Sequence, residues 1–312
     1  MSKVAVIGVG AWGKNLARNF YELGALKSIC SQDYLERQES KWQNIPVESF
    51  ETLVEDDSIK GFVIATPTPS HKNLAEQALK RGKHVFVEKP LAETSKEAYD
   101  LCSVAKGHDR CLMVGHLMRY HPCFERLLDE VAKGSIGDIL HISLRRCNFG
   151  KFRSYESIVR DFAPHDLSML YALLGANLDF NFKSRVTGPR LMPNADQASV
   201  FLQAGNVTVD LFFSRVWPIK EQLVVVQGSK GILVFDDTKP WEEKLSKSVY
   251  EIPHSGSCQE PLLKKELLDV LKGEPLKLEC EHFLACIKGT TPCRTPGEEG
   301  ALTLKWMEDI GV

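Results

Sequence analysis

The chain lacks long apolar runs, long runs of one charge, low-complexity tracts and internal repeats. Its longest apolar runs have the length of a strand, which excludes a segment that spans a bilayer. Its 39 basic and 41 acidic residues nearly balance, so nothing indicates a nucleic acid or an anionic membrane as a partner. We therefore expect a cytoplasmic protein that acts on a small molecule.

Cysteine is present but lacks the spacing of a metal or disulfide motif. The nine cysteines include no C-x-x-C pair, and their number is odd. We expect neither a disulfide framework nor a zinc site, and no bound metal. Most of these thiols, Cys147 among them, are expected to pack as small buried hydrophobic groups.

The first 119 residues alternate short apolar strands with helices, which predicts a doubly wound, mostly parallel sheet. The strands are expected near residues 3–7, 26–30, 46–48, 61–65, 84–87 and 112–115. The helices are expected near 13–23, 34–42, 49–55, 71–81 and 95–106. We predict that residues 1–119 form a dinucleotide-binding domain of Rossmann type.

The pattern changes from about residue 120, where longer strands are joined by short turns. Short turns favour antiparallel neighbours. A helix is expected over 121–133, another over 164–174, and strands over 137–147, 179–185, 197–204, 207–215, 221–227 and 231–235. We predict that residues 120–312 form an α/β domain with an open, mostly antiparallel sheet. The polar stretch 236–278 is left unassigned, and the closing helices, 279–288 and 297–310, are free to pack back on the first domain.

A glycine-rich turn follows the first predicted strand and opens the first predicted helix. Its residues Gly8, Gly10, Ala11, Trp12 and Gly13 form G-x-G-x-x-G in the context that a dinucleotide site requires. The first glycine allows the tight turn, the second lets the backbone approach a pyrophosphate, and the third lets helix and strand pack closely. The helix N-terminus adds free N–H groups for the phosphates. The alternative is a turn with a structural role alone.

Two further turns are expected at the same sheet edge. Ser31 and Gln32 end the second strand, where an NAD site usually has an acid that holds the ribose 2′-hydroxyl. These side chains hydrogen-bond a 2′-hydroxyl or tolerate a 2′-phosphate, so we expect NAD and leave NADP open. Thr66, Pro67 and His71 belong to the turn and helix start after the fourth strand, and we expect them beside the cofactor. The alternative is an ordinary loop.

The segment Glu88-Lys89-Pro90 follows the strand expected at 84–87. Ligands of open α/β sheets bind in the crevice beyond the carboxyl ends of the strands. Lys89 is therefore a candidate catalytic residue, since burial can tune the pKa of an amine there. We expect all three residues to contact the cofactor. The alternative is a lysine that points into water and pairs with Glu88.

A second constellation, from Asp161 to Asp166, is expected to open the helix 164–174. Pro164 suits a helix start, and Asp161 is a candidate N-cap or orienting carboxylate. His165 is then expected in the first turn, where the helix dipole disfavours the imidazolium and leaves a neutral general base. Asp166 is expected to hold the ring of His165 or to cap the helix. The alternative is a helix-start histidine kept for hydrogen bonding.

A family resemblance rests on four motifs in this order: Gly8-x-Gly10-x-x-Gly13, Thr66-Pro67 with His71, Glu88-Lys89-Pro90, and Asp161-x-x-x-His165. Together they resemble the Gfo/Idh/MocA oxidoreductases over essentially the whole chain. The resemblance implies a Rossmann domain, a second domain with an open antiparallel sheet, and NAD(P)-dependent chemistry on sugar carbons. It implies that Lys89 lies near the nicotinamide, that His165 is the acid or base, and that Asp161 fills the other acidic position.

The stretches 10–19, 115–122 and 161–166 resemble the branch that acts on UDP-linked N-acetylhexosamines and oxidises their C3 hydroxyl. Lys89, Asp161 and His165 are accordingly expected at the substrate. Further candidates for holding the sugar or its diphosphate are Arg119, Tyr120, Arg145, Asn148, Arg153 and Tyr155. The alternative for strand arginines is pairing with surface acids.

Two other functions remain open at this point. One is an inositol, free-sugar or diol dehydrogenase of the same family, which needs no diphosphate site. The other is a regulator that binds NAD(H) without turnover, although such a protein needs neither Lys89 nor His165. The resemblance also implies a homo-oligomer, either a dimer or a tetramer.

Overall fold

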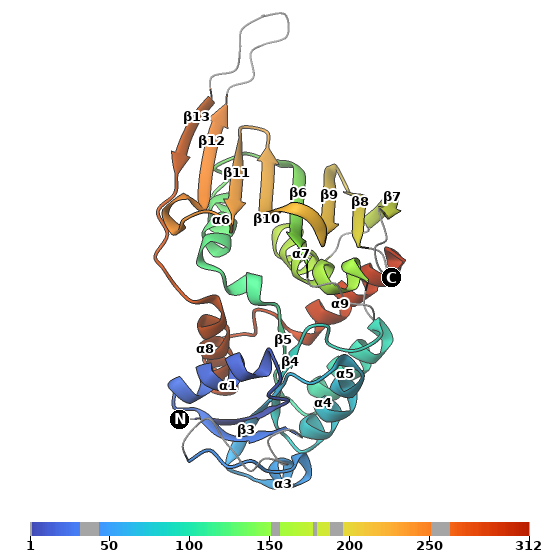
Figure 1. Ribbon diagram of the computed structural model, residues 1–312, viewed down its shortest axis with the longest axis vertical. Helices are drawn as coiled ribbons and strands as arrows, with labels where there is room; N and C mark the ends of the chain where they lie inside the picture. The colour runs from blue at the N-terminus through green and yellow to red at the C-terminus, as the bar shows by residue number, and fades with distance from the viewer. Residues whose placement is uncertain are drawn as a thin grey trace, which may run out of the picture. The chain divides into compact units, whose positions relative to one another are not determined.

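The computed structural model describes residues 2–31, 44–150, 157–176, 180–187, 196–250 and 263–311. The chain divides into two compact units (Figure 1). Unit 1 comprises the residues up to Tyr120 together with Glu274–Lys305, and unit 2 comprises His121–Gly273 together with the chain from Trp306 on. Unit 1 is therefore assembled from two segments that lie far apart in the sequence.

The sheet of unit 1 has five parallel strands in the order β2-β1-β3-β4-β5. They are β1 (Lys3–Ile7), β2 (Leu26–Cys30), β3 (Ile59–Ile64), β4 (His84–Glu88) and β5 (Leu112–Gly115). The strands are near-continuous apolar runs because a parallel sheet is buried on both faces. The order reverses at β1, which creates a topological switch point beside the end of that strand. The predicted Rossmann arrangement is confirmed.

Helices cover the sheet of unit 1, as right-handed crossovers require. They are α1 (Gly13–Glu22), α3 (Phe50–Glu55), α4 (His71–Lys80), α5 (Ser95–Gly107), α8 (Pro275–Ile287) and the first part of α9 (Gly297–Asp309). Two 3-10 turns, η1 (Thr68–Ser70) and η2 (Leu117–Tyr120), join them. Side chains cap two of these helices: Ser49 accepts from the Thr52 N–H at 3.3 Å, and Thr94 accepts from the Glu97 N–H at 3.2 Å.

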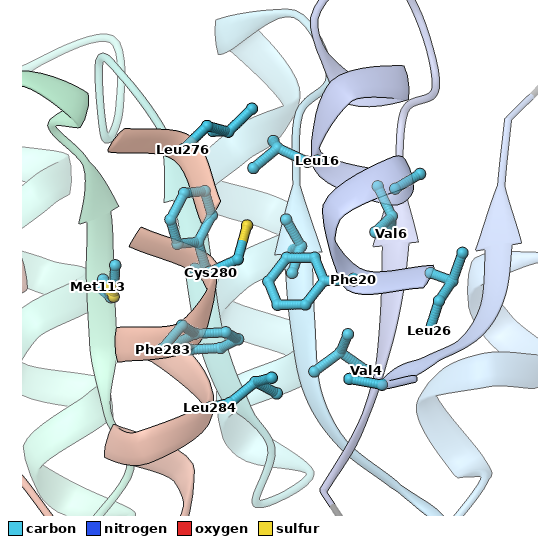
Figure 2. Packing of buried hydrophobic residues seen from close by; sticks show 14 of the residues in the cluster. Val4, Val6, Leu16, Phe20, Leu26, Met113, Leu276, Cys280, Phe283 and Leu284 are labelled. Atoms are coloured by element: carbon cyan, nitrogen blue, oxygen red, sulfur yellow. The ribbon is translucent and has the colours of Figure 1, made fainter. Parts of the chain in front are cut away.

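The core of unit 1 joins α8 to α1 and the sheet, although α8 comes from the second segment. Figure 2 shows Cys280 and Phe283 of α8 facing Phe20 of α1. The Phe283 ring meets those of Phe20 and Phe86 edge-on, with centroids 6.4 and 5.8 Å apart. A Cβ on Gly61 of β3 would lie 2.7 Å from Ile287, so α8 packs directly on the sheet.

One predicted strand of unit 1 is wrong. The expected strand at 46–48 makes a single isolated bridge, between Val47 and Ile29. A three-residue stretch between turns is too short for a ladder. The helix expected at 34–42 lies outside the described residues.

The sheet of unit 2 has eight strands in the order β13-β12-β11-β10-β6-β9-β8-β7. They are β6 (Ile139–Phe149), β7 (Phe180–Thr187), β8 (Gln197–Ala204), β9 (Val207–Ser214), β10 (Val216–Gly228), β11 (Gly231–Asp236), β12 (Leu245–Tyr250) and β13 (Leu263–Leu267). All neighbours are antiparallel except β6 and β9, so the expected mostly antiparallel sheet is confirmed. The stretch left unassigned by the sequence supplies β12, β13 and the 3-10 turn η3 (Trp241–Glu243).

Two helices pack on this sheet, α6 (Pro122–Ala132) and α7 (Ile158–Leu174) (Figure 1). His121 caps α6 by accepting from the Cys123 N–H at 3.1 Å. The start of α7 corrects the prediction, because the helix begins six residues before the expected residue 164. Ser157 is its N-cap and accepts from the Arg160 N–H at 3.2 Å. Pro164 therefore lies inside the helix, where a buried position offsets the backbone hydrogen bond that proline cannot make.

Candidate active site

The glycine turn of unit 1 has the geometry of a phosphate cradle. Gly8 has φ +86, and a Cβ there would lie 2.8 Å from the carbonyl oxygen of Ala65. A Cβ on Gly13 would lie 1.8 Å from the Gly8 oxygen, so both positions require glycine. By contrast, no atom lies within 4 Å of a Cβ placed on Gly10. The first turn of α1 carries no acid, so its positive end is open to a phosphate.

Neighbouring strand ends meet at this turn. The Gly8 N–H donates to the Cys30 carbonyl at 2.7 Å, which puts Ser31, the residue after β2, beside the glycine turn. The Thr66 methyl group lies 2.8 Å from the Cβ position of Gly8. The structure thus brings together the ends of β1, β2 and β3, where the sequence predicts contacts with the cofactor. Gln32 lies outside the described residues.

The buried His71 side chain hydrogen-bonds to two of the predicted turns. Its ring is 1% exposed, with Nε2 at 2.8 Å from the Thr66 carbonyl and Nδ1 at 2.9 Å from the Pro90 carbonyl. Burial lowers the pKa of the ring, although both hydrogen bonds act to raise it. The structure gives His71 the role of holding the Thr66 and Pro90 turns together, rather than an exposed position beside them.

Glu88 and Trp12 join the glycine turn to the end of β4. The Trp12 indole N–H donates to the Glu88 carboxylate at 2.5 Å, and the Lys89 N–H donates to the other oxygen at 3.3 Å. Trp12 is 41% exposed, whereas Glu88 is buried. Burial raises the pKa of the Glu88 carboxyl to about 7. Lys89 follows directly, half-buried at the carboxyl end of the strand.

A second buried acid lies next to Glu88 and was not expected from the sequence. Glu279 of α8 is 0% exposed, and neither of its carboxylate oxygens has a hydrogen-bond partner among the described residues. Burial, with the charge of Glu88 as the next cause, raises its pKa well above the usual range. Burial of this kind favours the neutral form of a carboxyl group. No local motif predicts this acid, because α8 belongs to the second segment of unit 1.

Asp161 and His165 lie one turn apart on α7 of unit 2, on the same face of the helix. Asp161 lies in the first turn and His165 one turn later, so two predictions are wrong: Asp161 is not the N-cap, and His165 is not in the first turn. The helix dipole therefore acts less strongly on His165 than expected, because its field falls off within the first turn. The buried Arg215 guanidinium lies 3.6 Å from the Asp161 carboxylate.

Asp166 neither orients His165 nor caps the helix, which corrects that prediction. Its carboxylate accepts from Nε and Nη2 of Arg146 on β6, at 3.1 and 2.5 Å. Burial raises the pKa of Asp166 above its ordinary value, against the lowering effect of Arg146. Asn148, two residues further along β6, has a buried Oδ1 without a hydrogen-bond partner in the described part of the chain.

Arg119 and Tyr120 lie inside unit 1 and have packing partners there. The Arg119 guanidinium donates to the Glu299 carboxylate at 2.5 Å. The Tyr120 hydroxyl is 3.0 Å from Thr295 Oγ1, and its ring is 1% exposed beneath Arg294. The structure gives no support to the expectation that these two side chains hold the substrate.

The sequence also predicts contacts with the sugar or its diphosphate for Arg145, Arg153 and Tyr155. Arg145 donates to the Glu221 carboxylate and stacks 4.7 Å from the Phe212 ring, which is the surface-type pairing weighed as its alternative. Arg153 and Tyr155 lie outside the described residues. The sequence gives no local signal for Arg146 and Arg215, whose partners are distant in the chain, or for Glu279, which a distant segment brings close to Glu88.

Comparison with known proteins agrees with this architecture. A family profile described as an oxidoreductase family with an NAD-binding Rossmann fold, Gfo/Idh/MocA, matches residues 2–116. A solved structure of UDP-N-acetylglucosamine 3-dehydrogenase from Acidithiobacillus ferrooxidans superposes with a TM-score of 0.81 at 23% identity, over 99% of this chain and 96% of that one. At that identity the superposition demonstrates the fold.

Two relatives match nearly the full length. The UDP-N-acetylglucosamine 3-dehydrogenase of Acidithiobacillus ferrooxidans is 26% identical over 97% of this chain and 94% of its own length. The scyllo-inositol 2-dehydrogenase (NAD(+)) of Bacillus subtilis is 24% identical over 94% of this chain and 88% of its own. No helix in the described ranges combines the length and the apolar character needed to cross a membrane. Residues 2–116 thus form the NAD-binding Rossmann domain of the Gfo/Idh/MocA oxidoreductases, and the chain is an NAD(P)-dependent oxidoreductase acting on a small molecule.

Proposed function

We propose that this oxidoreductase uses NAD to oxidise the C3 hydroxyl of a UDP-linked N-acetylhexosamine to a ketone. The observation that carries the proposal is the full-length similarity to a UDP-N-acetylglucosamine 3-dehydrogenase, at 26% identity over 97% of the chain. The lysine at the end of β4 and the Asp161-x-x-x-His165 pair on α7 supply the groups that this chemistry needs.

The residues of unit 1 fit a dinucleotide. The open space at Gly10 and the acid-free start of α1 suit a pyrophosphate. Ser31 and Thr66 stand at the adjacent strand ends, on the two sides of the switch point. The chemistry that a bound nicotinamide supplies is acceptance of a hydride.

Proton abstraction and stabilisation of the developing charge are assigned to His165 and Lys89, respectively. His165 takes the proton of the hydroxyl as a general base, which is typically worth about 10²–10⁴ in rate. Lys89 donates a hydrogen bond to the same oxygen and stabilises the negative charge that develops there. Asp161 lies one turn before His165 on the same face of α7, and the Arg215 guanidinium 3.6 Å away favours its charged form.

NAD is preferred over NADP because the position after β2 holds Ser31. A serine hydroxyl hydrogen-bonds a ribose 2′-hydroxyl, and no arginine stands at this position to bind a 2′-phosphate. Ser31→Arg should therefore raise affinity for NADP relative to NAD. Titration of both cofactors against the wild type and the variant measures this ratio, and an unchanged ratio would remove Ser31 from the site.

The test of the substrate is absorbance of the reduced nicotinamide with NAD or NADP and a panel of UDP-N-acetylglucosamine, its uronic acid, myo-inositol and glucose. A 3-keto product accumulates poorly at equilibrium, so an aminotransferase trap is included. Turnover with a UDP-sugar alone is expected. Turnover with myo-inositol alone favours the second candidate, an inositol dehydrogenase, which the 24% identity to scyllo-inositol 2-dehydrogenase supports.

Two substitutions test the assigned roles. Lys89→Met and His165→Asn should each lower kcat by at least about 10²-fold while NAD still binds. Lys96→Met and His108→Asn are matched controls, because both side chains are on the surface of α5 or at its end. Wild-type turnover in either site variant would contradict its role.

We also propose self-association through the sheet face of unit 2 that α6 and α7 leave uncovered. Phe201, 46% exposed, projects from β8 on the side opposite its buried neighbours Val200 and Leu202. Light scattering on the eluted protein should give a dimer or a larger assembly, and Phe201→Glu should shift it toward the monomer. A wild-type monomer at micromolar concentration would refute this.

A further inference from the structure

Three cysteines of unit 1 come together near the amino-terminal ends of β4 and β5, whereas the glycine turn follows the carboxyl end of β1. The sulfur atoms of Cys111, Cys286 and Cys293 all lie within 4.8 Å of one another. Cys286 is buried, whereas Cys111 and Cys293 are partly exposed. All three are free thiols, and in the described part of the chain they form the single group with the spacing of metal ligands.

We propose that Cys111, Cys286 and Cys293 bind a thiophilic d10 cation of the zinc class through three thiolates. Zinc binds cysteine sulfur at about 2.3 Å, so sulfurs of a tetrahedral site lie about 3.8 Å apart. The observed spread, up to 4.8 Å, needs shifts of less than about 1 Å to reach this geometry. Two thiols that form a disulfide would leave the third outside, whereas one cation uses all three.

The fold places each ligand on a separate, well-anchored segment. Cys111 immediately precedes β5, and its N–H donates to Nδ1 of His84 at 3.1 Å. Cys286 lies in the last turn of α8, which packs on the sheet. Cys293 precedes a stretch that pairs with the edge of β5, where the Val114 N–H donates to the Thr295 carbonyl at 2.8 Å. A cation would therefore join three elements that already have fixed positions.

His282 provides a supporting contact of the kind that metal sites use. It lies one turn before Cys286 on the same face of α8. Nε2 of His282 accepts from the Arg294 backbone N–H at 2.9 Å, so a neutral ring carries its proton on Nδ1 and has it available for a thiolate ligand. Groups that hydrogen-bond the ligands in this way typically change metal affinity by about 10–100-fold.

Solvent reaches the cluster. The three cysteines line an open hollow with a volume of about 600 Å³. The same hollow is lined by three basic residues, Lys106, Arg110 and Lys288, and by two acids, Asp109 and Glu298. The excess of one positive charge offsets the net negative charge of a divalent cation held by three thiolates. The fourth coordination position is thus left for a water or a small ligand from this side. Binding releases the thiol protons, so affinity should increase with pH.

The test uses the full-length, reduced protein without an affinity tag that binds metal. Zinc content is measured by mass spectrometry after dialysis against micromolar zinc, and cobalt(II) titration reports thiolate charge-transfer absorption. The expected result is about one equivalent per chain, as a single convergent site implies. Cys286→Ser and Cys293→Ser should abolish it, His282→Gln should weaken it by about 10-fold or more, and Cys102→Ser should retain it. Cys102 is the matched control because it lines the same hollow outside the trio.

A second measurement covers variants that fail to fold. In the wild type, bound zinc should protect Cys111, Cys286 and Cys293 from alkylation, while Cys30 reacts at an unchanged rate. Two outcomes would overturn the proposal: no binding by the reduced wild type at micromolar zinc, or an oxidised pair among these thiols in a protein that takes up no metal when reduced. Neither readout depends on the substrate, so the result is independent of the proposed function.

Discussion

The two units present their candidate catalytic groups in different ways. In unit 1, Gly8, Thr66 and Lys89 stand at or just beyond the carboxyl ends of parallel strands. In unit 2, Asp161 and His165 lie within a helix of 17 residues, with a buried proline between them. A residue at a strand end is placed by the local chain, because the strand and its turn fix it. A residue within a helix is placed by where the helix begins and by which face packs on the sheet.

The two units also differ in the partners of their buried acids. In unit 2, Asp166 is held by Arg146, a cation on a neighbouring element. In unit 1, Glu88 accepts from an indole and a backbone N–H, and Glu279 has no hydrogen-bond partner among the described residues. The first arrangement keeps a charge in the interior, whereas the second favours neutral carboxyl groups. Four pairs of substitutions test these differences between the units.

The largest effect is expected at Gly13. Gly13→Ala places a Cβ 1.8 Å from the Gly8 oxygen, so the backbone has to move, and the free energy of unfolding should fall by about 3 kcal/mol or more. Gly10→Ala meets no atom within 4 Å and should change stability by less than about 0.5 kcal/mol. Urea denaturation measures both. Calorimetric titration should show weaker NAD binding in Gly10→Ala, and unchanged affinity would contradict the phosphate cradle.

The next effect concerns the buried pair of unit 2. Arg146→Met leaves Asp166 without its cation, and breaking such a pair typically costs about 3 kcal/mol. Arg145→Met on the same strand removes a partly exposed pair with Glu221 and should cost no more than about 1 kcal/mol. Chemical denaturation separates the two. Equal losses would mean that Asp166 is neutral in the folded chain and does not need Arg146.

The acids of unit 1 predict a pH dependence of stability. The pKa of Glu88 is raised from 4.5 to about 7 by burial, so between these values the folded chain retains a proton that the unfolded chain has lost. The free energy of unfolding therefore falls as pH rises through this window. Glu88→Gln keeps an acceptor for Trp12 and should make the fall shallower. Thermal denaturation across the window measures it, with the exposed Glu22→Gln as control; an unaltered slope would exclude Glu88 as the source.

The smallest effect tests the start of α7. Ser157→Ala removes the N-cap and should cost about 1 kcal/mol. Asp161→Asn removes the carboxylate that lies 3.6 Å from the buried Arg215 guanidinium, so a loss there reports this ion pair and not the cap. Denaturation of Ser157→Ala tests the helix start. An unchanged free energy of unfolding in Ser157→Ala would mean that Ser157 is not the N-cap.

Much of the fold could be predicted from the sequence, and the reasons are local. The glycine turn and the strands β1, β2, β4 and β5 were expected within a few residues of their observed bounds. The sequence predicts too late a start for α7. Proline is common in the first turn of a helix, so Pro164 indicates a start at that residue. Burial against the sheet stabilises this proline inside the helix, and a linear pattern does not record that.

Some positions in the candidate site could likewise be predicted from the sequence, and others could not. The positions of Gly8, Gly10, Ser31, Thr66 and Lys89 follow from strand ends that share one edge of a parallel sheet. The burial of Arg119 and Tyr120 did not follow, because their partners Glu299 and Thr295 come from the second segment of unit 1. A charged or aromatic residue after a strand gives the same signal whether it faces a ligand or a later part of the chain.

By itself the sequence determined the alternation of strands and helices, the glycine turn and the lysine beyond β4, because these depend on contacts within a few residues. Tertiary structure alone decided which acids are buried, which histidine holds two turns together, and that Cys111, Cys286 and Cys293 meet. The last three come from segments up to 182 positions apart (residues 111 and 293), and linear spacing carries no information about such a meeting. The physical reason is the return of α8 to the first unit, where its apolar face packs on α1 and the sheet.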